Sequence, residues 1–461
     1  MTLHENAPKL KVIIIGGGLV GSLSACYFGK HGHEVHLYEL REDIRKTEMA
    51  KGKSINLAMS NRGRKALRAV GLEEEVLQQA IPMKARMIHN KDGTLHQVLY
   101  DYQNQQCIYS VSRKHLNELL LTAAEKYQNV KTHFNHKLIS ADLENGNVTF
   151  ELQDKQVVTY EADLIVGADG VYSAVRKQML KMPMFNYSQT YIDHGYMELV
   201  IPSTHDNQFA MLPNFLHIWP RGTFMLIALP NQDRSWTVTL FMPFNQFALV
   251  KTQDEILDFF QQNFPDAIPL IGRKRLVDDF LSSKASTLIS IKCQPYNVGS
   301  HSIIIGDAAH GMVPFYGQGM NAGFEDCRLL DELLTKFNWN LTIALNEFST
   351  TRNPNAQAIC DLAIYNYIEM RDLVAKKSFL LRKYIDHILH KVMPNTWVPL
   401  YTTVAFTDME YAQCLRNKEW QDNVVSQVII ISKATLAVTF LGIVTSIMCL
   451  TKFDYIKTYF S

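Results

Sequence analysis

The sequence predicts an α/β fold, because strand and helix patterns alternate from the start of the chain. Lys11 to Ile15 is a short apolar run typical of a buried strand, Leu19 to Lys30 has helical spacing, and Glu34 to Glu39 predicts a second strand. Two more strand patterns, Ala162 to Val166 and His301 to Ile305, each run into a glycine-containing turn far along the chain. We therefore expect one sheet built from dispersed segments, with a second domain interleaved between them.

The segments between these strands differ in composition from the first domain. Ile81 to Tyr100 and Tyr191 to Leu240 are rich in aromatic and β-branched residues, which favour strands. The pattern from Ala322 to Leu334 is helical, and a helical pattern with spaced aromatic residues begins at about Asn355. These patterns predict a Rossmann-like domain from residues 1–80, 104–185 and 291–350, a β-sheet domain from 81–103 and 186–290, a helical C-terminal region over 351–427, and a transmembrane helix over 428–450.

Composition excludes several classes of protein. Of the 461 residues, 46 are Lys or Arg and 45 are Asp or Glu, and 47% are hydrophobic, which is typical of a globular chain and not of a disordered or fibrous one. The formal net charge of +1 gives no reason to expect a nucleic-acid partner. The seven cysteines form no C-x-x-C pair and no cluster at ligand spacing, which argues against disulfides and a metal site and favours a reducing compartment. The sequence does not identify a protein partner.

A G-x-G-x-x-G motif from Gly16 to Gly21 joins the first strand to the first helix. Gly16 allows a tight turn, Gly18 lets backbone N–H groups approach a pyrophosphate, and Gly21 lets the helix pack on the strand. Glu39 ends the second strand, about 20 residues on, where a carboxylate would bind the adenosine ribose. A glycine-rich turn without a ligand is the alternative, but this context favours a dinucleotide. The acidic residue favours FAD or NAD over NADP, and the motif alone leaves the choice between FAD and NAD open.

Two later motifs favour FAD. The stretch from Asp163 to Gly170 ends in Gly-Ala-Asp-Gly and resembles the DG motif of the single-component flavin aromatic hydroxylases, and the stretch from Ile305 to His310 resembles their GD motif. Asp307 at a strand end can accept hydrogen bonds from ribityl hydroxyls. The N–H groups that follow, from Gly319 to Asn321, open a helix whose positive end could face a reduced flavin. Each motif alone could be a structural turn, but the three in order indicate a flavoprotein.

The resemblance also accounts for what the chain lacks. There is no second G-x-G-x-x-G motif for a separate nicotinamide domain, which is normal in this family because NAD(P)H is expected to dock transiently over the flavin. A disulfide reductase would need that domain and a redox C-x-x-C pair. The paired-tryptophan motif W-x-W-x-I-P of related flavin halogenases is absent, so halogenation is disfavoured.

Six ordered segments, which together cover nearly the whole chain, resemble the kynurenine 3-monooxygenase family. They are GKSINLAMSNRGRKAL from Gly52, IPMKARMIH from Ile81, SVSRKHLNELL from Ser110, YSQTYIDHGYMEL from Tyr187, PFYGQGMNAGFEDC from Pro314 and YNYIEMR from Tyr365. The resemblance implies an FAD-dependent monooxygenase that hydroxylates L-kynurenine to 3-hydroxy-L-kynurenine with NADPH and O2, through a flavin C4a-hydroperoxide. The protein would position the aromatic ring and exclude water.

The same resemblance implies that four residues bind the amino-acid end of kynurenine: Arg86, Tyr100, Asn366 and Tyr401. Residues 90–94, Asn-Lys-Asp-Gly-Thr, have the composition of a three-residue hairpin loop that would pair Asn90 with Thr94. That register puts Arg86 and Tyr100 on one face as diagonal neighbours, roughly 7–8 Å apart. A two-residue Asp-Gly turn would put them on opposite faces. Without the resemblance, Arg86 would be interpreted as a solvated strand residue.

The resemblance further implies cofactor contacts at Val20, Arg41, Ala58, Arg113 and Leu138. The predicted cofactor-binding set also includes the motif residues Gly16, Gly18, Gly21, Glu39, Asp169, Asp307, Gly319, Met320 and Asn321. Arg113 follows Ser112, an expected N-cap, so its cation could reach the flavin phosphates from a helix start. Leu138 would act through its backbone. His310 is interpreted as structural, because a histidine in such a turn is more often structural than a general base.

The C-terminal segment predicts a membrane anchor. Ala434 to Leu450 carries no charge, and Lys433 is the only charged residue between Val428 and Leu450. A helix over that longer window would be roughly 34 Å long, enough to cross a hydrocarbon core. A buried C-terminal helix is the alternative, because the hydrophobicity is moderate. The flanking lysines and the short tail resemble a mitochondrial outer-membrane tail anchor, which would leave the catalytic part in the cytosol.

Three other functions are compatible with the sequence. The chain could hydroxylate another aromatic or isoprenoid substrate, bind flavin as a membrane-tethered scaffold without turnover, or act as a flavin dehydrogenase that reduces membrane quinones. The intact Asp169, Asp307 and Gly319 weigh against a scaffold.

Overall fold

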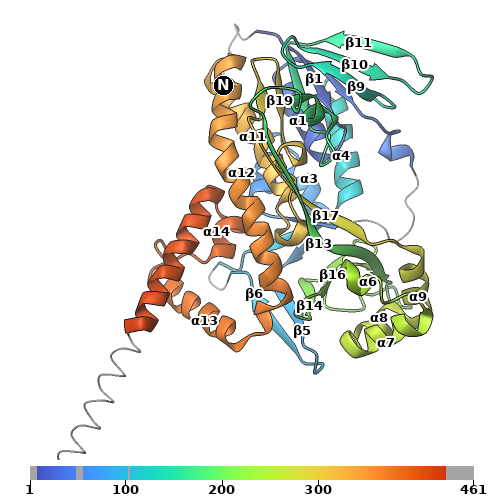
Figure 1. The fold of residues 1–461 in the computed structure, drawn as a ribbon, viewed down its shortest axis with the longest axis vertical. Helices are drawn as coiled ribbons and strands as arrows, with labels where there is room; N and C mark the ends of the chain where they lie inside the picture. Colours follow the sequence, from blue (N-terminus) through green and yellow to red (C-terminus); the bar gives the residue numbers. More distant parts are fainter. Residues whose placement is uncertain (1–7, 48–55, 102–103, 432–461) are drawn as a thin grey trace, which may run out of the picture.

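The computed structural model describes residues 8–47, 56–101 and 104–431 (Figure 1). Within these ranges the strands form four sheets: one of six strands, one of seven, and two of three. Helices cover the six-stranded sheet, and further helices form the C-terminal region at one end of the molecule (Figure 1). The predicted mixed α/β architecture with a helical C-terminal region is confirmed.

The six-stranded sheet carries the predicted β-α-β unit. Its strand order is β18-β19-β12-β1-β2-β8, and β1 pairs in parallel with both β2 and β12. The strands are β1 (Lys11–Ile15), β2 (Glu34–Tyr38), β8 (Val130–His133), β12 (Leu164–Gly167), β18 (Asn297–Val298) and β19 (Ser302–Ile304). Because the chain order reverses beside β1, the carboxyl ends of β1 and β12 form a topological switch point, where open α/β sheets bind ligands.

Apolar side chains explain why these strands lie at the centre. Val12, Ile13 and Ile14 are fully buried, so β1 is covered on both faces, as parallel strands require. The helices that cover the sheet are α1 (Leu19–Lys30), α4 (Arg113–Glu125), α11 (Gly319–Lys336) and α12 (Leu341–Arg371). The sequence pattern predicts a helix from about Asn355, but α12 begins at Leu341 and runs through Pro354, so the proline does not mark its start.

The seven-stranded sheet combines strands that precede β12 in the sequence with strands that follow it. Its order is β17-β13-β16-β15-β14-β5-β6, in which β5 and β14 pair in parallel. The strands are β5 (Ala85–His89), β6 (Leu95–Leu99), β13 (Asn186–Ile201), β14 (Phe215–Pro220), β15 (Met225–Pro230), β16 (Trp236–Pro243) and β17 (Ser286–Gln294). Helices α7 (Gln253–Asn263), α8 (Ala267–Ile271) and α9 (Arg273–Ser282) share a core with this sheet that includes Trp236 and Phe260.

Smaller elements complete the fold. The three-stranded sheets are β3 (Asn56–Met59), β7 (Ile108–Ser112) and β4 (Ile81–Met83), and β9 (Lys137–Asp142), β10 (Asn147–Glu151) and β11 (Val157–Glu161). The short helices are α2 (Asn61–Ala69), α3 (Glu73–Gln78), α5 (Ala174–Met179), α6 (Phe244–Phe247) and α10 (Asp307–His310), with 3-10 turns η1 (Ile44–Lys46), η2 (Pro314–Tyr316) and η3 (Leu373–Ala375).

The C-terminal region contains α13 (Lys377–Val392), α14 (Leu400–Phe406) and a helix over residues 411–431. Among the described residues, no helix is both long and apolar enough to cross a membrane. Most of the predicted span over 428–450, from residue 432 onward, lies outside the described residues.

Candidate active site

The glycine turn after β1 has the steric features that a bound pyrophosphate needs. Gly16 has a φ of +109°, and a Cβ at that position would lie 2.5 Å from the carbonyl oxygen of Ala168. A Cβ at Gly21 would lie 1.9 Å from the carbonyl oxygen of Gly16, so only glycine lets α1 approach this closely. At Gly18, in contrast, a Cβ would meet no described atom within 4 Å. The turn therefore combines two sterically obligatory glycines with one that faces open space.

We expect the two kinds of glycine to respond differently to alanine. Gly21→Ala should lower the free energy of unfolding by about 3 kcal/mol or more, because backbone must move. Gly18→Ala should cost about 1 kcal/mol at most but weaken FAD binding at least roughly tenfold, because its methyl group would obstruct the backbone N–H groups. Urea unfolding and flavin titration of the deflavinated protein would separate the effects. Unchanged FAD affinity in Gly18→Ala would show that the pyrophosphate does not bind this turn.

Glu39 lies beside the glycine turn, as its position after β2 predicts. Its Oε2 accepts a hydrogen bond from the Gly17 N–H at 2.8 Å, and its Oε1 accepts one from the Arg41 N–H at 3.0 Å. The carboxylate is thus held at the carboxyl end of β2 by backbone donors. Leu138 lies on β9, two residues beyond His136, whose N–H donates to the Glu39 carbonyl at 2.9 Å, so the strand places it near Glu39.

Asp169 and Asp307 follow β12 and β19 at the same edge of the sheet. Asp169 Oδ2 accepts from the N–H groups of Ala174 and Val175, whereas its buried Oδ1 has no hydrogen-bond partner in the described part of the chain. Burial raises the pKa of both carboxyls, and the Arg113 cation opposes this at Asp307. A buried acceptor without a donor is costly, so Asp169 suits a ligand that offers hydroxyl donors, and Asp307 lies at the same edge of the sheet.

The start of α11 faces Asp307 and provides further donors. A Cβ on Gly319 would lie 3.8 Å from Asp307 Oδ1, and the first N–H groups of a helix have no partner within it. The Asn321 side chain is already used, because it accepts from the Ser60 N–H at 2.8 Å and donates to the carbonyls of Ala58 and Gly317. We therefore expect Gly319, Met320 and Asn321 to contact a ligand through their backbone.

Three other predicted cofactor residues have different surroundings. Val20 of α1 packs against Gly306. A Cβ on Gly306 would lie 3.0 Å from the Cγ2 of Val20, so α1 and the Gly306 turn are in close contact. Ser112 caps α4 by accepting from the His115 N–H, as predicted, and this places Arg113 at the helix start. Arg41 is exposed. The Nε2 of His310 donates to Asp326 Oδ2 at 2.6 Å, and Asp326 also accepts from the Gly306 N–H at 2.7 Å, which supports a structural role for His310.

These observations fit FAD. Gly18, at the start of α1, leaves space for the pyrophosphate, and Glu39 suits the adenosine ribose. Asp169 and Asp307 offer acceptors for the hydroxyl groups of the ribityl chain. The positive end of α11 suits the edge of the flavin ring at which charge accumulates on reduction.

The four predicted substrate residues converge on one cluster, with Arg86 on β5, Tyr100 just after β6, Asn366 on α12 and Tyr401 on α14. The hairpin register is confirmed: the Asn90 N–H donates to the Thr94 carbonyl, and Arg86 pairs with Val98, so Tyr100 is its diagonal neighbour. The Arg86 guanidinium lies 4.9 Å from the Tyr401 ring centroid and 5.8 Å from that of Tyr100. Tyr100 and Tyr401 stack with their centroids 4.8 Å apart.

Arg86 is 6% exposed, which contradicts the interpretation of a solvated strand residue. Its Nη1 lies 3.0 Å from Glu369 Oε1, and its Nη2 donates to Asn366 Oδ1 at 3.4 Å. The Nε–H of Arg86 is buried and has no hydrogen-bond partner among the described residues. Burial raises the pKa of Tyr100 to about 12, so its hydroxyl keeps its proton and can donate. The cluster thus holds unused donors suited to a carboxylate.

Glu369 is a site residue that sequence reasoning missed. Burial alone would raise the pKa of its carboxyl, but Lys383 and Arg86 lower it, so Glu369 stays charged at neutral pH. It follows Asn366 by three residues on α12, and this helical spacing within YNYIEMR was the only local signal that it shares a face with a predicted site residue. A carboxylate beside an arginine with an unpaired Nε–H suits a ligand that carries both an ammonium and a carboxylate group.

Comparisons with known proteins agree with this geometry. A family profile described as an FAD binding domain matches residues 9–363. The fold is similar to that of 2-methyl-3-hydroxypyridine-5-carboxylic acid oxygenase, with a TM-score of 0.64 and 21% identity over 78% of this chain and 92% of that one. It is also similar to p-nitrophenol 4-monooxygenase from Pseudomonas putida, with a TM-score of 0.63 and 17% identity over 81% and 91%. The family profile, the fold and the site together define an FAD-binding protein.

Relatives of higher sequence identity show the family to which the chain belongs. The chain is 60% identical to kynurenine 3-monooxygenase of Anopheles gambiae over 91% of this chain and 87% of the relative. It is 50% identical to kynurenine 3-monooxygenase of Sus scrofa over 91% and 88%. The chain belongs to the kynurenine 3-monooxygenase family of FAD-dependent aromatic monooxygenases.

Proposed function

We propose that this protein hydroxylates L-kynurenine to 3-hydroxy-L-kynurenine with NADPH and O2. The observation that carries the proposal is the buried cluster of Arg86, Tyr100, Asn366 and Glu369, which offers both a cation with free donors and a carboxylate to an amino-acid group. The relatives that share most of the chain carry the name kynurenine 3-monooxygenase. The glycine turn from Gly16 to Gly21, Glu39, Asp169 and Asp307 would hold FAD, which would supply the redox chemistry between NADPH and O2.

The side chains have binding and positioning tasks in this proposal. Arg86 and Tyr100 would bind the substrate carboxylate, and Glu369 with Asn366 would orient the ammonium group. Phe315 stacks on Tyr367 with centroids 3.7 Å apart and meets Phe241 edge-on at 4.8 Å, which forms an aromatic wall beside Asn366. Asn366 also donates to the Phe315 carbonyl at 2.7 Å, so the wall and the polar cluster are fixed relative to each other. Such a wall would hold the substrate ring and exclude water.

The proposal predicts that L-kynurenine stimulates NADPH oxidation by the purified full-length protein. The protein would be reduced with NADPH without oxygen, with and without L-kynurenine, and then mixed with oxygenated buffer. We expect a product heavier than kynurenine by one oxygen atom. An equal rate of NADPH oxidation with and without kynurenine, and no hydroxylated product, would refute the assignment of substrate.

We further propose that residues 428–450 anchor the protein in the mitochondrial outer membrane, with the catalytic part in the cytosol. The support is the uncharged sequence from Ala434 to Leu450, preceded by four exposed apolar residues at the end of the described helix. The full-length protein should resist alkaline extraction from mitochondria, and Ile443→Arg should release it, because a central arginine costs about 3 kcal/mol. Release of the unaltered protein by alkali would contradict the anchor.

A further inference from the structure

Helix α13 exposes an apolar stripe to solvent. Leu381, Tyr384, Ile388 and Val392 are spaced by three, four and four residues, so they lie on one face of the helix. Each is between 43% and 71% exposed. A helix on the surface of a globular protein normally turns such a stripe toward the core. The α13 stripe, defined by these four residues, is turned outward.

Polar contacts on the opposite side hold α13 in this orientation. The Lys383 Nζ lies 3.7 Å from the buried Glu369 carboxylate, and Arg382 pairs with Asp422 of the helix over residues 411–431 at 3.0 Å. The indole N–H of Trp397 donates to Asp386 Oδ1 at 3.0 Å. Rotating the stripe into the protein would break all three contacts, so its exposure is built into the fold.

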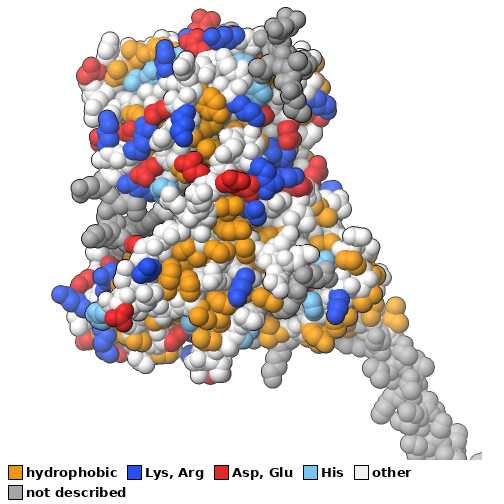
Figure 2. Space-filling view, turned by 180° about the vertical axis from the view of Figure 1, so that it is seen from behind, with side chains coloured by type: hydrophobic (Ala, Val, Ile, Leu, Met, Phe, Trp, Pro, Cys, Tyr) orange, Lys and Arg blue, Asp and Glu red, His pale blue; other side chains and the backbone are white. Residues whose placement is uncertain are grey.

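The helix over residues 411–431, which Arg382 of α13 contacts through Asp422, has a second exposed apolar group at the end of its described part. Val428, Ile429, Ile430 and Ile431 are between 47% and 65% exposed, and the sequence beyond them continues without charge from Ala434 to Leu450. α13 and the end of this helix lie at the same end of the molecule (Figure 1), and hydrophobic side chains gather over the lower part of the face seen from behind (Figure 2). The two exposed apolar groups therefore lie at the same end of the molecule.

Charge distinguishes between a lipid surface and a second copy of the chain. Arg382 and Lys383 pair with acidic side chains on the opposite side of α13, whereas Lys391 is exposed near the stripe and no acidic partner for it is found among the described residues. A two-fold contact between stripes would bring the Lys391 of each copy into an apolar interface, which is unfavourable. An anionic lipid headgroup region offers the opposite charge, and an amphipathic helix with leucine, tyrosine and isoleucine on one face and a lysine near it suits that interface.

We propose that the α13 stripe lies in the headgroup region of an anionic lipid bilayer, so that the catalytic part rests on the membrane by a surface separate from its anchor. This inference rests on the proposed membrane attachment of residues 428–450. It adds a defined orientation: the end of the molecule that carries α13 faces the lipid.

The test is amide hydrogen exchange of the full-length protein with and without phosphatidylcholine vesicles that contain phosphatidylserine. We expect exchange in residues 378–393 to slow roughly tenfold on the vesicles, and to slow less on phosphatidylcholine alone. The double variant Ile388→Asn/Val392→Asn should lose this protection while still floating with the vesicles. A matched control, Leu212→Asn/Leu249→Asn, alters two apolar residues elsewhere that are 59% and 67% exposed, and it should keep this protection.

Three results would overturn the inference. Unchanged exchange in residues 378–393, with protection confined to 434–450, would refute the α13 contact but leave the anchor intact. A protein that does not bind vesicles at all would refute both proposals. Slow exchange in residues 378–393 before vesicles are added would mean that the chain itself or a second copy covers the stripe, and size measurement at two concentrations would tell these apart.

Discussion

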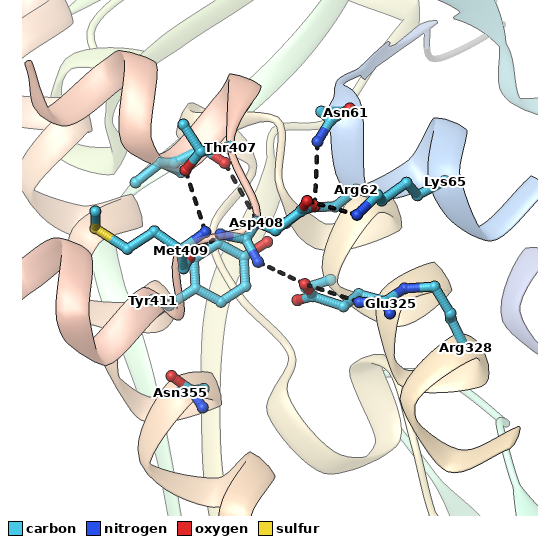
Figure 3. Close-up of polar contacts among 12 residues, drawn as sticks. Asn61, Arg62, Lys65, Glu325, Arg328, Asn355, Thr407, Asp408, Met409 and Tyr411 are labelled. Carbon is cyan, nitrogen blue, oxygen red and sulfur yellow. Dashed lines mark hydrogen bonds and ion pairs between the residues drawn. The ribbon is translucent and has the colours of Figure 1, made fainter. Parts of the chain in front are cut away.

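Arg62→Met is expected to lower the free energy of unfolding by about 3–5 kcal/mol, because it removes one partner of a buried charge network. Arg62 is 2% exposed and lies on α2. Its Nη1 lies 2.5 Å from Glu325 Oε1 on α11, its Nη2 donates to the Met409 carbonyl, and its Nε donates to the Val404 carbonyl. Figure 3 shows Arg62 between Glu325 and the loop that carries Asp408 and Met409.

The network gives this substitution consequences beyond stability. The Arg62 guanidinium lies 4.0 Å from the Tyr411 ring centroid, so it also holds the start of the helix over residues 411–431. Arg352 bridges Glu325 and Asp326, and Asp326 accepts from the N–H of Gly306, next to Asp307. Tyr401 lies on α14, which ends just before the loop that Arg62 binds. We therefore expect weaker binding of both FAD and substrate in Arg62→Met.

A nearby ion pair provides the control. Lys65 lies one turn along α2 and pairs with Asp408, but both side chains are partly exposed, so Lys65→Met should cost about 0.5 kcal/mol. Arg62→Lys keeps the charge but not the planar fork and should fall between the two. Denaturant unfolding followed by flavin fluorescence measures all three. Equal losses in Arg62→Met and Lys65→Met would contradict a special role for Arg62.

The pH dependence provides an independent check. Burial would raise the pKa of Glu325, but Arg352 and Arg62 lower it below its usual value. A carboxyl whose pKa is lower in the folded state stabilises the protein above its unfolded-state pKa of about 4.3, and this stabilisation is lost as the pH falls through the folded-state value. The difference in stability between the unaltered protein and Arg62→Met should therefore shrink as the pH falls below about 4.

The sequence predicts correctly those parts of the fold that depend on nearby residues, such as the periodicity of a helix or strand and the composition of a turn. The β1-α1-β2 unit follows from periodicity and from glycines whose missing Cβ atoms have a steric reason, and the β5-β6 register follows from the composition of residues 90–94. Long-range polar contacts leave no such local signal. Arg86 and Glu369 are 283 positions apart, and Arg62 and Glu325 are 263 apart. In sequence, each of these residues resembles a solvated surface charge, so only the fold reveals the pairs.

Arg86→Met is expected to lower kcat/KM for L-kynurenine about 100-fold, mainly through KM, while FAD remains bound. Losing a charge-assisted contact to the substrate carboxylate costs about 1.5–3 kcal/mol, and each 1.4 kcal/mol is a factor of ten. Glu369 would also lose a partner, although Lys383 remains near it. Lys84→Met serves as the matched control, because Lys84 lies two residues from Arg86 but is exposed and contacts the Phe215 ring. The KM of Lys84→Met for L-kynurenine should be unchanged.

Glu369→Gln distinguishes a substrate contact from a structural ion pair. If Arg86 and Glu369 only stabilised each other, both single variants would lose stability with little change in KM, and the double variant Arg86→Met/Glu369→Gln would recover it. If they bind the two charged groups of an amino acid, each single variant raises KM, and the double variant is worse than either. We expect the second result. Adding Glu369→Gln to Arg86→Met should raise the KM for kynurenine further, and it should raise the KM less for an analogue that lacks the amino group. Loss of FAD from Arg86→Met, with an unchanged KM after reconstitution, would show that Arg86 does not bind the substrate.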